Sequence, residues 1–229
     1  GFDGHAFGHQ LQADTTRVVE AAGGTVAGAV RAPLNASDFS SFLRQAQASQ
    51  AQVLALANAG GDTINAIKAA TESGITRRMK LAGLMVFIND IHALGLKATQ
   101  GLYLTDSWYW NQSPETRAWA RRFQERVGRM PSSLQAADYS AATQYLAAVR
   151  AVGSDDGDKV MGHLRKARFN DVFMKGGYAR PDGRVVHDMY LMQVKAPDQS
   201  TEPWDYYNVV ETFKGEAAWQ TKADTKCPL

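Results

Sequence analysis

The chain has 229 residues, a hydrophobic content of 45% and a formal net charge of +2. A chain of this length can bury an ordinary core, as one large domain or as two smaller lobes. Its positive charge forms no basic block, so neither a nucleic acid nor an anionic membrane surface is favoured as a partner. The longest apolar stretches are strand-sized, shorter than the ~20 residues that cross a bilayer. The composition predicts a soluble globular protein.

The first hundred residues alternate between predicted helices and strands. Gly23-Gly24 is typical of a helix end, Ser37-Asp38 of a helix start, and Gly74 of another helix end. Such alternation predicts a parallel α/β sheet with helices on both faces. The expected helices are 7–22, 39–47, 62–72 and 90–94, and the expected strands are 25–30, 53–57, 80–84 and 102–105.

After Asp106 the pattern changes. Trp108, Tyr109 and Trp110 stand together, and Ser113-Pro-Glu has the form of a helix start. Three helices follow one another, over 114–127, 135–152 and 156–166, and then come a turn at 180–183 and strands at 189–194 and 206–213. Helices without an intervening strand indicate a second lobe. Because that lobe has no evident sheet, we expect further chain before Gly1 to supply its strands.

The segment Gln52 to Ala70 reads as a buried strand, a glycine turn and a helix start. Gly60-Gly61 allows a sharp turn, and Asp62 is suited to cap the helix that follows. In doubly wound folds, ligands bind beyond the carboxyl ends of such strands. Asn58 and the turn after it are therefore candidates for a ligand site.

Other chemistries have weaker signals. His5 and His9 are four residues apart, as in some zinc sites, and Asp3 is a third candidate, but two ligands do not make a site. The Gly60-Gly61 turn lacks the fingerprint of a nucleotide site, and no Gly-x-Ser-x-Gly elbow occurs. We expect no metal, no cofactor and no catalytic group.

The ends of the chain leave alternatives open. The chain starts with Gly1-Phe-Asp-Gly, which does not have the pattern of a signal peptide. A mature chain from which a signal peptide has been removed would also lack that pattern. The single Cys227 is a free surface thiol if the chain is complete, or a disulfide partner of a missing part if it is not.

Several segments together resemble one family. They are Phe7-Gly8 opening a helix, Leu-Ala-Asn58-Ala-Gly-Gly-Asp-Thr-Ile, Gly101-Leu-Tyr-Leu-Thr-Asp106, Asp138-Tyr-Ser-Ala, and Asp182-Gly-Arg-Val-Val-His-Asp-Met-Tyr. They resemble the periplasmic solute-binding proteins of ABC transporters of the branched-chain amino acid (Leu/Ile/Val-binding) type. Within that type, the likeness is to a subgroup that takes up aromatic and other organic acids, and it covers the whole chain.

The resemblance implies a type I periplasmic binding fold, with two doubly wound lobes joined by three crossovers. It assigns residues 1–107 to the C-terminal lobe, 108–187 to the second, mainly helical part of the N-terminal lobe, and 188–229 to strands that return to the C-terminal lobe. The first part of the N-terminal lobe is then absent from this sequence.

The resemblance also implies ligand-binding positions, each with a structural alternative. Phe7 corresponds to a ligand-stacking aromatic, or else packs on Leu11 as a helix staple; His5 lies in the same loop. Asn58 and Ala59 lead to helix N–H groups that can receive a carboxylate, although Asn58 can bond its own turn. Met85 and Phe87 are further ligand-binding positions, although both can instead face the core. Trp108 and Tyr109 are the last two, although both can instead pack the crossover between the lobes. Packing at the crossover is the expected role of Trp110.

The loop with Met85 and Phe87 is where amino-acid binders of the family carry an acid for the ligand ammonium, and no acid stands there. An unpaired buried ammonium costs several kcal/mol. The preferred ligand is therefore an aromatic or aliphatic carboxylate without an amino group. Asp90 and Asp106 keep an amino-acid ligand open, and Asp106 is counted among the ligand-binding candidates.

These features predict a periplasmic, monomeric protein that is not an enzyme. It captures a small carboxylate by lobe closure and delivers it to an ABC permease. The alternatives are a branched-chain or other amino acid binder and the ligand-sensing domain of a regulator.

Overall fold

The computed structural model describes residues 2–3 and 6–224, which divide into two compact units. Unit 1 comprises Gly1–Thr105 and Met192–Val209, and unit 2 comprises Asp106–Leu191 and Val210–Leu229. The chain therefore passes between the units three times, at 105/106, 191/192 and 209/210.

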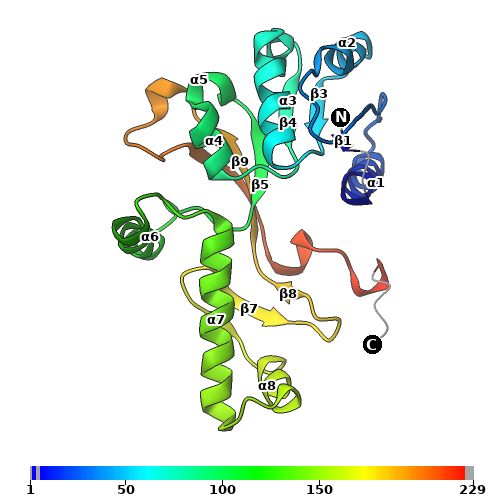
Figure 1. Cartoon of the computed structure of the whole chain (residues 1–229). Helices are drawn as coiled ribbons and strands as arrows, with labels where there is room; N and C mark the ends of the chain where they lie inside the picture. The colour runs from blue at the N-terminus through cyan, green and yellow to red at the C-terminus, as the bar shows by residue number, and fades with distance from the viewer. Residues whose placement is uncertain (1, 4–5, 225–229) are drawn as a thin grey trace. The chain divides into compact units, whose positions relative to one another are not determined.

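Unit 1 is built around a five-stranded sheet of order β10-β9-β5-β4-β3 (Figure 1). The strands are β3 (Val53–Leu56), β4 (Lys80–Gly83), β5 (Tyr103–Asp106), β9 (Met189–Val194) and β10 (Tyr207–Phe213), and the last three continue across the boundary between the units. β3 pairs with β4 and β4 with β5, both in parallel. The predicted parallel α/β sheet is thus confirmed.

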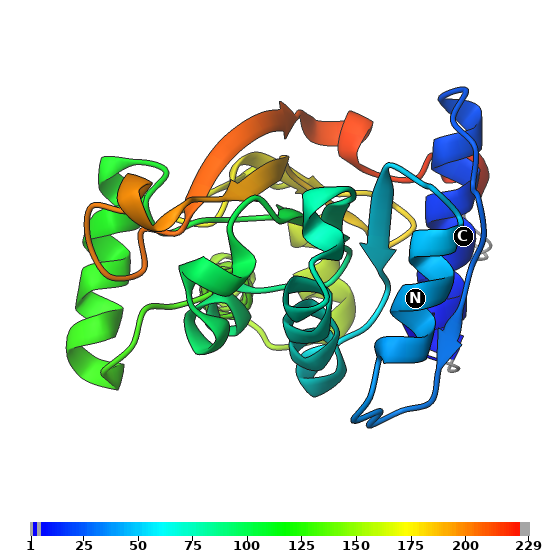
Figure 2. The same ribbon diagram turned by 90° about the horizontal axis from the view of Figure 1, so that it is seen from above.

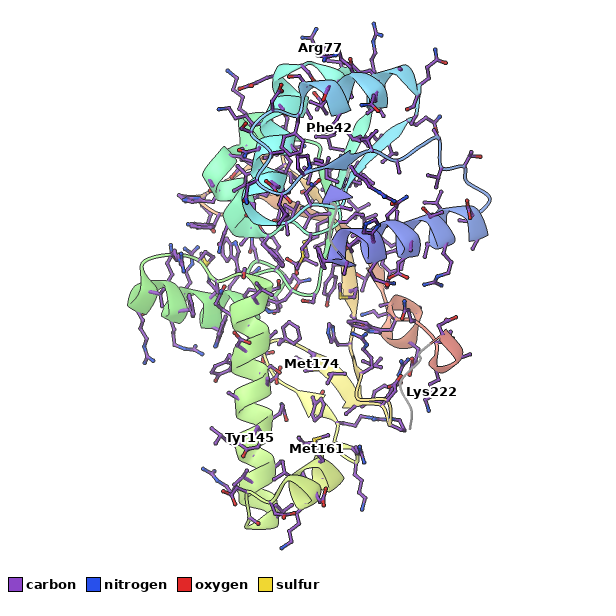
Figure 3. All side chains as sticks on the ribbon, turned by 45° about the vertical axis from the view of Figure 1, so that its right-hand side comes forward. Phe42, Arg77, Tyr145, Met161, Met174 and Lys222 are labelled. Carbon is purple, nitrogen blue, oxygen red and sulfur yellow. The ribbon has the colours of Figure 1, made fainter. Side chains whose placement is uncertain are left out.

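The helices of unit 1 follow the predicted alternation. They are α1 (Ala6–Ala21), α2 (Ser40–Ala48), α3 (Gly60–Glu72), η1 (Ile75–Arg77), α4 (Ile88–Leu94) and α5 (Leu96–Thr99), and η2 (Pro197–Gln199) lies between β9 and β10. Figure 2 shows α2 and α3 beside β3, and Phe42 on α2 is labelled in Figure 3. Burial of apolar side chains on strands and helices stabilises this unit, and its buried residues include Leu54, Leu56, Leu81, Leu104, Ile67 and Ile91.

Unit 2 begins with three capped helices, as predicted. They are α6 (Pro114–Val127), α7 (Ser133–Val152) and α8 (Gly157–Leu164). The hydroxyl of Ser113 accepts the N–H of Thr116 at 3.1 Å, which confirms the predicted helix start. Gly128 and Gly153 end α6 and α7 in the left-handed conformation that glycine adopts without a steric penalty.

Unit 2 also contains a small antiparallel sheet of order β6-β7-β8. Its strands are β6 (Phe169–Asn170), β7 (Lys175–Ala179) and β8 (Val185–Val186), and the predicted turn lies between β7 and β8, where the N–H of Gly183 donates to the carbonyl of Arg180 at 3.0 Å. The unit continues after β10 into η3 (Gly215–Ala218) and η4 (Lys222–Asp224). Tyr145 on α7 and Met161 on α8, both labelled in Figure 3, are exposed.

Asp171 ties α7 to this sheet. Its carboxylate accepts hydrogen bonds from the hydroxyl of Ser140 at 2.7 Å and the amide of Gln144 at 2.8 Å, as well as from the N–H groups of Phe173 and Met174. Burial raises the pKa of Asp171, but these four hydrogen bonds outweigh it and lower the pKa below its usual value. One carboxylate therefore fixes the loop before β7 on the helix.

Two local predictions are wrong. The strand expected at 25–30 is irregular, and a two-residue strand β2 (Arg31–Ala32) occurs instead, paired with β1 (Phe2–Asp3). A strand extends only where a partner offers hydrogen bonds, and among the described residues β1 pairs Phe2 with Arg31 and Asp3 with Ala32. Asp62 is not the helix cap, because α3 begins two residues earlier, after Ala59. The Asp62 carboxylate instead accepts the N–H of Asn35 at 3.0 Å.

Candidate functional site

The carboxyl edge of the parallel strands in unit 1 holds the first group of predicted site residues. Leu56 of β3 is in register with Gly83 of β4, and Gly83 with Leu104 of β5. The segments that follow β3 and β4 therefore leave the sheet at the same edge. Asn58 and Ala59 follow β3, and the loop with Met85 and Phe87 follows β4. This edge is the usual ligand site of an open parallel sheet.

The turn after β3 presents helix N–H groups without a side-chain cap. Asn58 is buried, with 1% of its surface exposed, and Ala59 is the extended N-cap residue of α3. Gly60 has φ +55° and nothing near the position of a Cβ atom, and Gly61 is exposed. The first turn of a 13-residue helix carries a partial positive charge. An anion can therefore be bound at this turn.

Two polar side chains in the first turn of α3, Asp62 and Thr63, differ in whether they make a hydrogen bond. Asp62, in the first turn, is 7% exposed and bonded to Asn35. The hydroxyl of Thr63, one residue further, is fully buried and has no hydrogen-bond partner among the described residues. A buried hydroxyl without a partner is uncommon in proteins.

The loop after β4 contains no acid between Gly83 and α4. Met85 and Phe87 are both half-buried. Asp90, in the first turn of α4, accepts the N–H of Phe87 at 2.9 Å and so holds the helix start. Burial raises the pKa of Asp90, and this hydrogen bond opposes the rise.

Asp106 ends β5 as a buried carboxyl group. It is 5% exposed, and its carboxylate accepts the N–H of Ser107 at 2.7 Å. Burial raises the pKa of Asp106 to about 7; hydrogen bonds from the Ser133 hydroxyl and from the N–H groups of Ser107 and Trp108 oppose the rise. Asp106 thus joins the end of β5 to the first residue of α7.

The aromatic residues after Asp106 are all buried in unit 2. Trp108 is 2% exposed, and its indole N–H donates to the carbonyl of Val172 at 2.9 Å. Its ring meets Trp119 of α6 edge to face, with centroids 5.6 Å apart. Tyr109 is 4% exposed and lies against Trp110, which is fully buried beneath Arg121. These contacts are those of a packed core.

The remaining candidates lie at the start of unit 1. Phe7, near the start of α1, is 44% exposed. His5 lies outside the described residues, as does Cys227. The edge of the sheet thus brings together Asn58, Ala59, Met85 and Phe87. Phe7 belongs to a separate helix of the same unit, and Asp106, Trp108 and Tyr109 belong to unit 2.

Within residues 2–3 and 6–224, no three His, Cys, Asp or Glu side chains are grouped so as to hold a metal ion. In the same part of the chain, no helix combines the length and the apolar character needed to cross a membrane.

Residues 2–201 match the family model described as "Periplasmic binding protein". The chain therefore belongs to the periplasmic binding protein family, which consists of solute-binding transport proteins rather than enzymes. This confirms the predicted family, the predicted type I periplasmic binding fold and the expectation that the protein is not an enzyme. No curated protein matches the chain.

Solved structures agree with this assignment. A periplasmic binding protein from Burkholderia mallei is 61% identical, with a TM-score of 0.93, and is matched over 99% of this chain and 60% of its own. A branched-chain amino acid ABC transporter periplasmic ligand-binding protein from Burkholderia xenovorans is 40% identical, with a TM-score of 0.91, over 99% and 61%. The chain thus spans about three fifths of the length of these structures.

One further structure shares the fold. A solute-binding protein of an ABC transporter from R. palustris, in complex with 4-hydroxybenzoate, is 22% identical, with a TM-score of 0.82, over 95% of this chain and 60% of its own. At this identity the likeness concerns the fold and not the ligand.

Proposed function

We propose that this chain forms part of a periplasmic solute-binding protein that captures a small organic acid between two lobes and delivers it to an ABC permease. In this proposal residues 1–107 belong to the C-terminal lobe, 108–187 to the N-terminal lobe, and 188–229 contain the return strands. Solute contacts made by both lobes stabilise the closed state over the open one.

The observation that carries the proposal is the turn between β3 and α3. Ala59 offers no side-chain cap, so the first N–H groups of α3 are available to a carboxylate at the edge where Asn58 lies. Met85 and Phe87 supply an apolar wall on the adjacent loop. In this assignment Phe7 and His5 stack on or contact the solute from the start of unit 1.

The charge of the site favours an acid over an amino acid. The loop after β4 has no acid before Asp90, and the Asp90 carboxylate already holds the N–H of Phe87. Asp106 is bonded to Ser107, with further hydrogen bonds from Ser133 and Trp108. An ammonium group would therefore compete with existing hydrogen bonds for either carboxylate, at a cost of several kcal/mol if left unpaired.

The likeness to the Burkholderia xenovorans protein supports a second candidate, because its name describes a branched-chain amino acid transporter component. In that case Asp106, together with Trp108 and Tyr109, would complete the solute site. Their burial in unit 2 would then have to change when solute binds.

A thermal-shift screen of the full-length protein separates the two candidates. We expect 4-hydroxybenzoate or octanoate to raise the melting temperature and leucine to leave it unchanged. Stabilisation by leucine alone would overturn the organic-acid assignment. The variant Gly61→Pro removes one N–H from the first turn of α3 at a position without a positive φ and should weaken acid binding, whereas Gly157→Pro in the first turn of α8 is a matched control that should not.

A further inference from the structure

Three aromatic side chains of unit 1 form a contact that the proposed solute site does not include. His92, on α4, stacks on Trp204, with ring centroids 3.7 Å apart and planes 9° apart. Nδ1 of His92 and the hydroxyl of Tyr206 are 2.8 Å apart, within hydrogen-bond distance. Trp204 and Tyr206 both lie between β9 and β10. We call these three residues the His92 clamp.

The segment that carries Trp204 and Tyr206 is held rigidly. Asp205 is 1% exposed; one carboxylate oxygen binds Nζ of Lys195 at 2.7 Å and the other accepts the N–H and hydroxyl of Thr201. Trp204 itself is buried and has φ +73°, an uncommon backbone conformation for a bulky residue. Such a conformation persists where the surrounding structure enforces it, often at functional sites.

The helix on the other side of the clamp is too short to be stable alone. α4 has seven residues and ends at Gly95, which has φ +78°. Isolated helices of this length are unstable in water, so tertiary contacts must fix its position. α4 begins directly after the loop with Met85 and Phe87. The position of α4 therefore determines where that loop lies.

The segment with Trp204 and Tyr206 also connects two of the three passages between the units. β9 crosses the boundary at 191/192 and β10 crosses it at 209/210. The backbone N–H of Lys195 donates to the carbonyl of Tyr206 at 2.8 Å, which keeps the two strand ends together. In Figure 1, α4 lies beside this segment, which is drawn in orange.

We propose that the His92 clamp is a positioning element that holds α4, and with it the Met85–Phe87 loop, on the strands β9 and β10 that cross between the units. This role rests on the proposed function, in which the loop forms part of the solute site. Solute contact at the loop is then coupled through α4 to two of the crossover strands. His92, Trp204 and Tyr206 act through this coupling and do not touch the solute.

Amide hydrogen exchange in the solute-free, full-length protein tests the clamp without any ligand. The reporters are the N–H groups of Ile91 and Gly95, which close the turns of α4. His92→Ala removes both the stack and the hydrogen bond, and we expect about tenfold faster exchange at these amides. Tyr206→Phe removes only the hydrogen bond, and we expect an increase of about threefold.

Two controls separate this effect from general destabilisation. His163→Ala changes an exposed histidine in α8 of unit 2 and should leave α4 exchange unchanged. The N–H of Gly153, which closes α7, should exchange at the wild-type rate in His92→Ala. Unchanged exchange at Ile91 and Gly95, or an equal increase at Gly153, would overturn the proposal.

Titration with 4-hydroxybenzoate tests the coupling. We expect His92→Ala to weaken binding about tenfold and Tyr206→Phe by a smaller factor, with His163→Ala at the wild-type affinity. Faster exchange in α4 with unchanged affinity would refute the coupling to solute capture. Failure of the wild-type protein to bind 4-hydroxybenzoate would count against this solute, while the exchange measurement would still decide whether the clamp positions α4.

Discussion

Replacing Asp106 by Asn should remove a pH-dependent loss of stability from the protein. Asp106 is 5% exposed, and burial raises its pKa to about 7 from an ordinary value of 3.8, against the hydrogen bonds from Ser133, Ser107 and Trp108. The folded protein therefore holds a proton on Asp106 over a pH range in which the unfolded chain has released it. Asn is neutral at every pH and resembles the protonated carboxyl group in shape.

The sign and size follow from this pKa difference. A carboxyl pKa that is raised in the folded state contributes stability that is fully present below about pH 4 and is lost as the pH rises through about 7. The difference between a pKa of 3.8 and one of about 7 corresponds to about 4 kcal/mol, because a tenfold change in an equilibrium constant is ~1.4 kcal/mol. The free energy of unfolding of Asp106→Asn should therefore rise, relative to that of the wild type, by about 4 kcal/mol between pH 4 and pH 8.

Urea denaturation of the full-length protein and of the variant at each pH measures this difference. Asp138→Asn, an exposed position on α7, is the matched control and should follow the wild-type profile. Parallel profiles of Asp106→Asn and wild type would show that the folded state does not hold this proton, and the reasoning from burial would be refuted. An NMR titration of the Asp106 carboxyl carbon gives the pKa directly.

Three further predictions concern stability, each measurable by chemical denaturation. Trp108→Phe leaves the buried carbonyl of Val172 without its indole donor and should lower the free energy of unfolding by about 1–3 kcal/mol; an unchanged value would mean that water replaces the indole. Asp205→Asn leaves the Lys195 charge without its partner and should cost about 3–5 kcal/mol at pH 7. Burial raises the pKa of Asp205, but hydrogen bonds from Lys195 and Thr201 outweigh it and lower the pKa to about 2. The contribution of Asp205 to the free energy of unfolding is therefore present above about pH 4 and should disappear as the pH falls through about 2. A wild-type stability that does not fall in this range would contradict the assignment. Gly60→Ala places a Cβ atom at φ +55° and should cost about 1 kcal/mol, whereas Gly61→Ala should cost less.

The sequence by itself determined the order of elements and the fold class. Local signals carry this information: the apolar run of β3, the glycine turn after it and the Ser113 cap of α6 each depend on residues within a few positions of one another. The run of residues 189–194 reads as a strand and is one. The combination of such segments was specific enough to indicate the family, which the family model confirms.

Tertiary structure decided what the candidate residues contact. The segment 25–30, expected to form a strand, is irregular, and the short strand Arg31–Ala32 occurs instead, paired among the described residues with β1. Asp62 bonds Asn35 rather than capping its own helix, since α3 starts earlier than its side chain suggests. In each case the deciding hydrogen bond joins residues that are distant in sequence.

The same limit applies to the candidate site. The sequence places Trp108 beside Asp106 but does not say that its indole reaches Val172, 64 residues away. Nor does it indicate that His92 meets Tyr206, 114 residues further along the chain. Local propensity reports what a residue prefers next to its neighbours, while burial and long-range pairing depend on the packed chain. Which residues line a solute site therefore depends on burial and long-range pairing, and local propensity does not determine it.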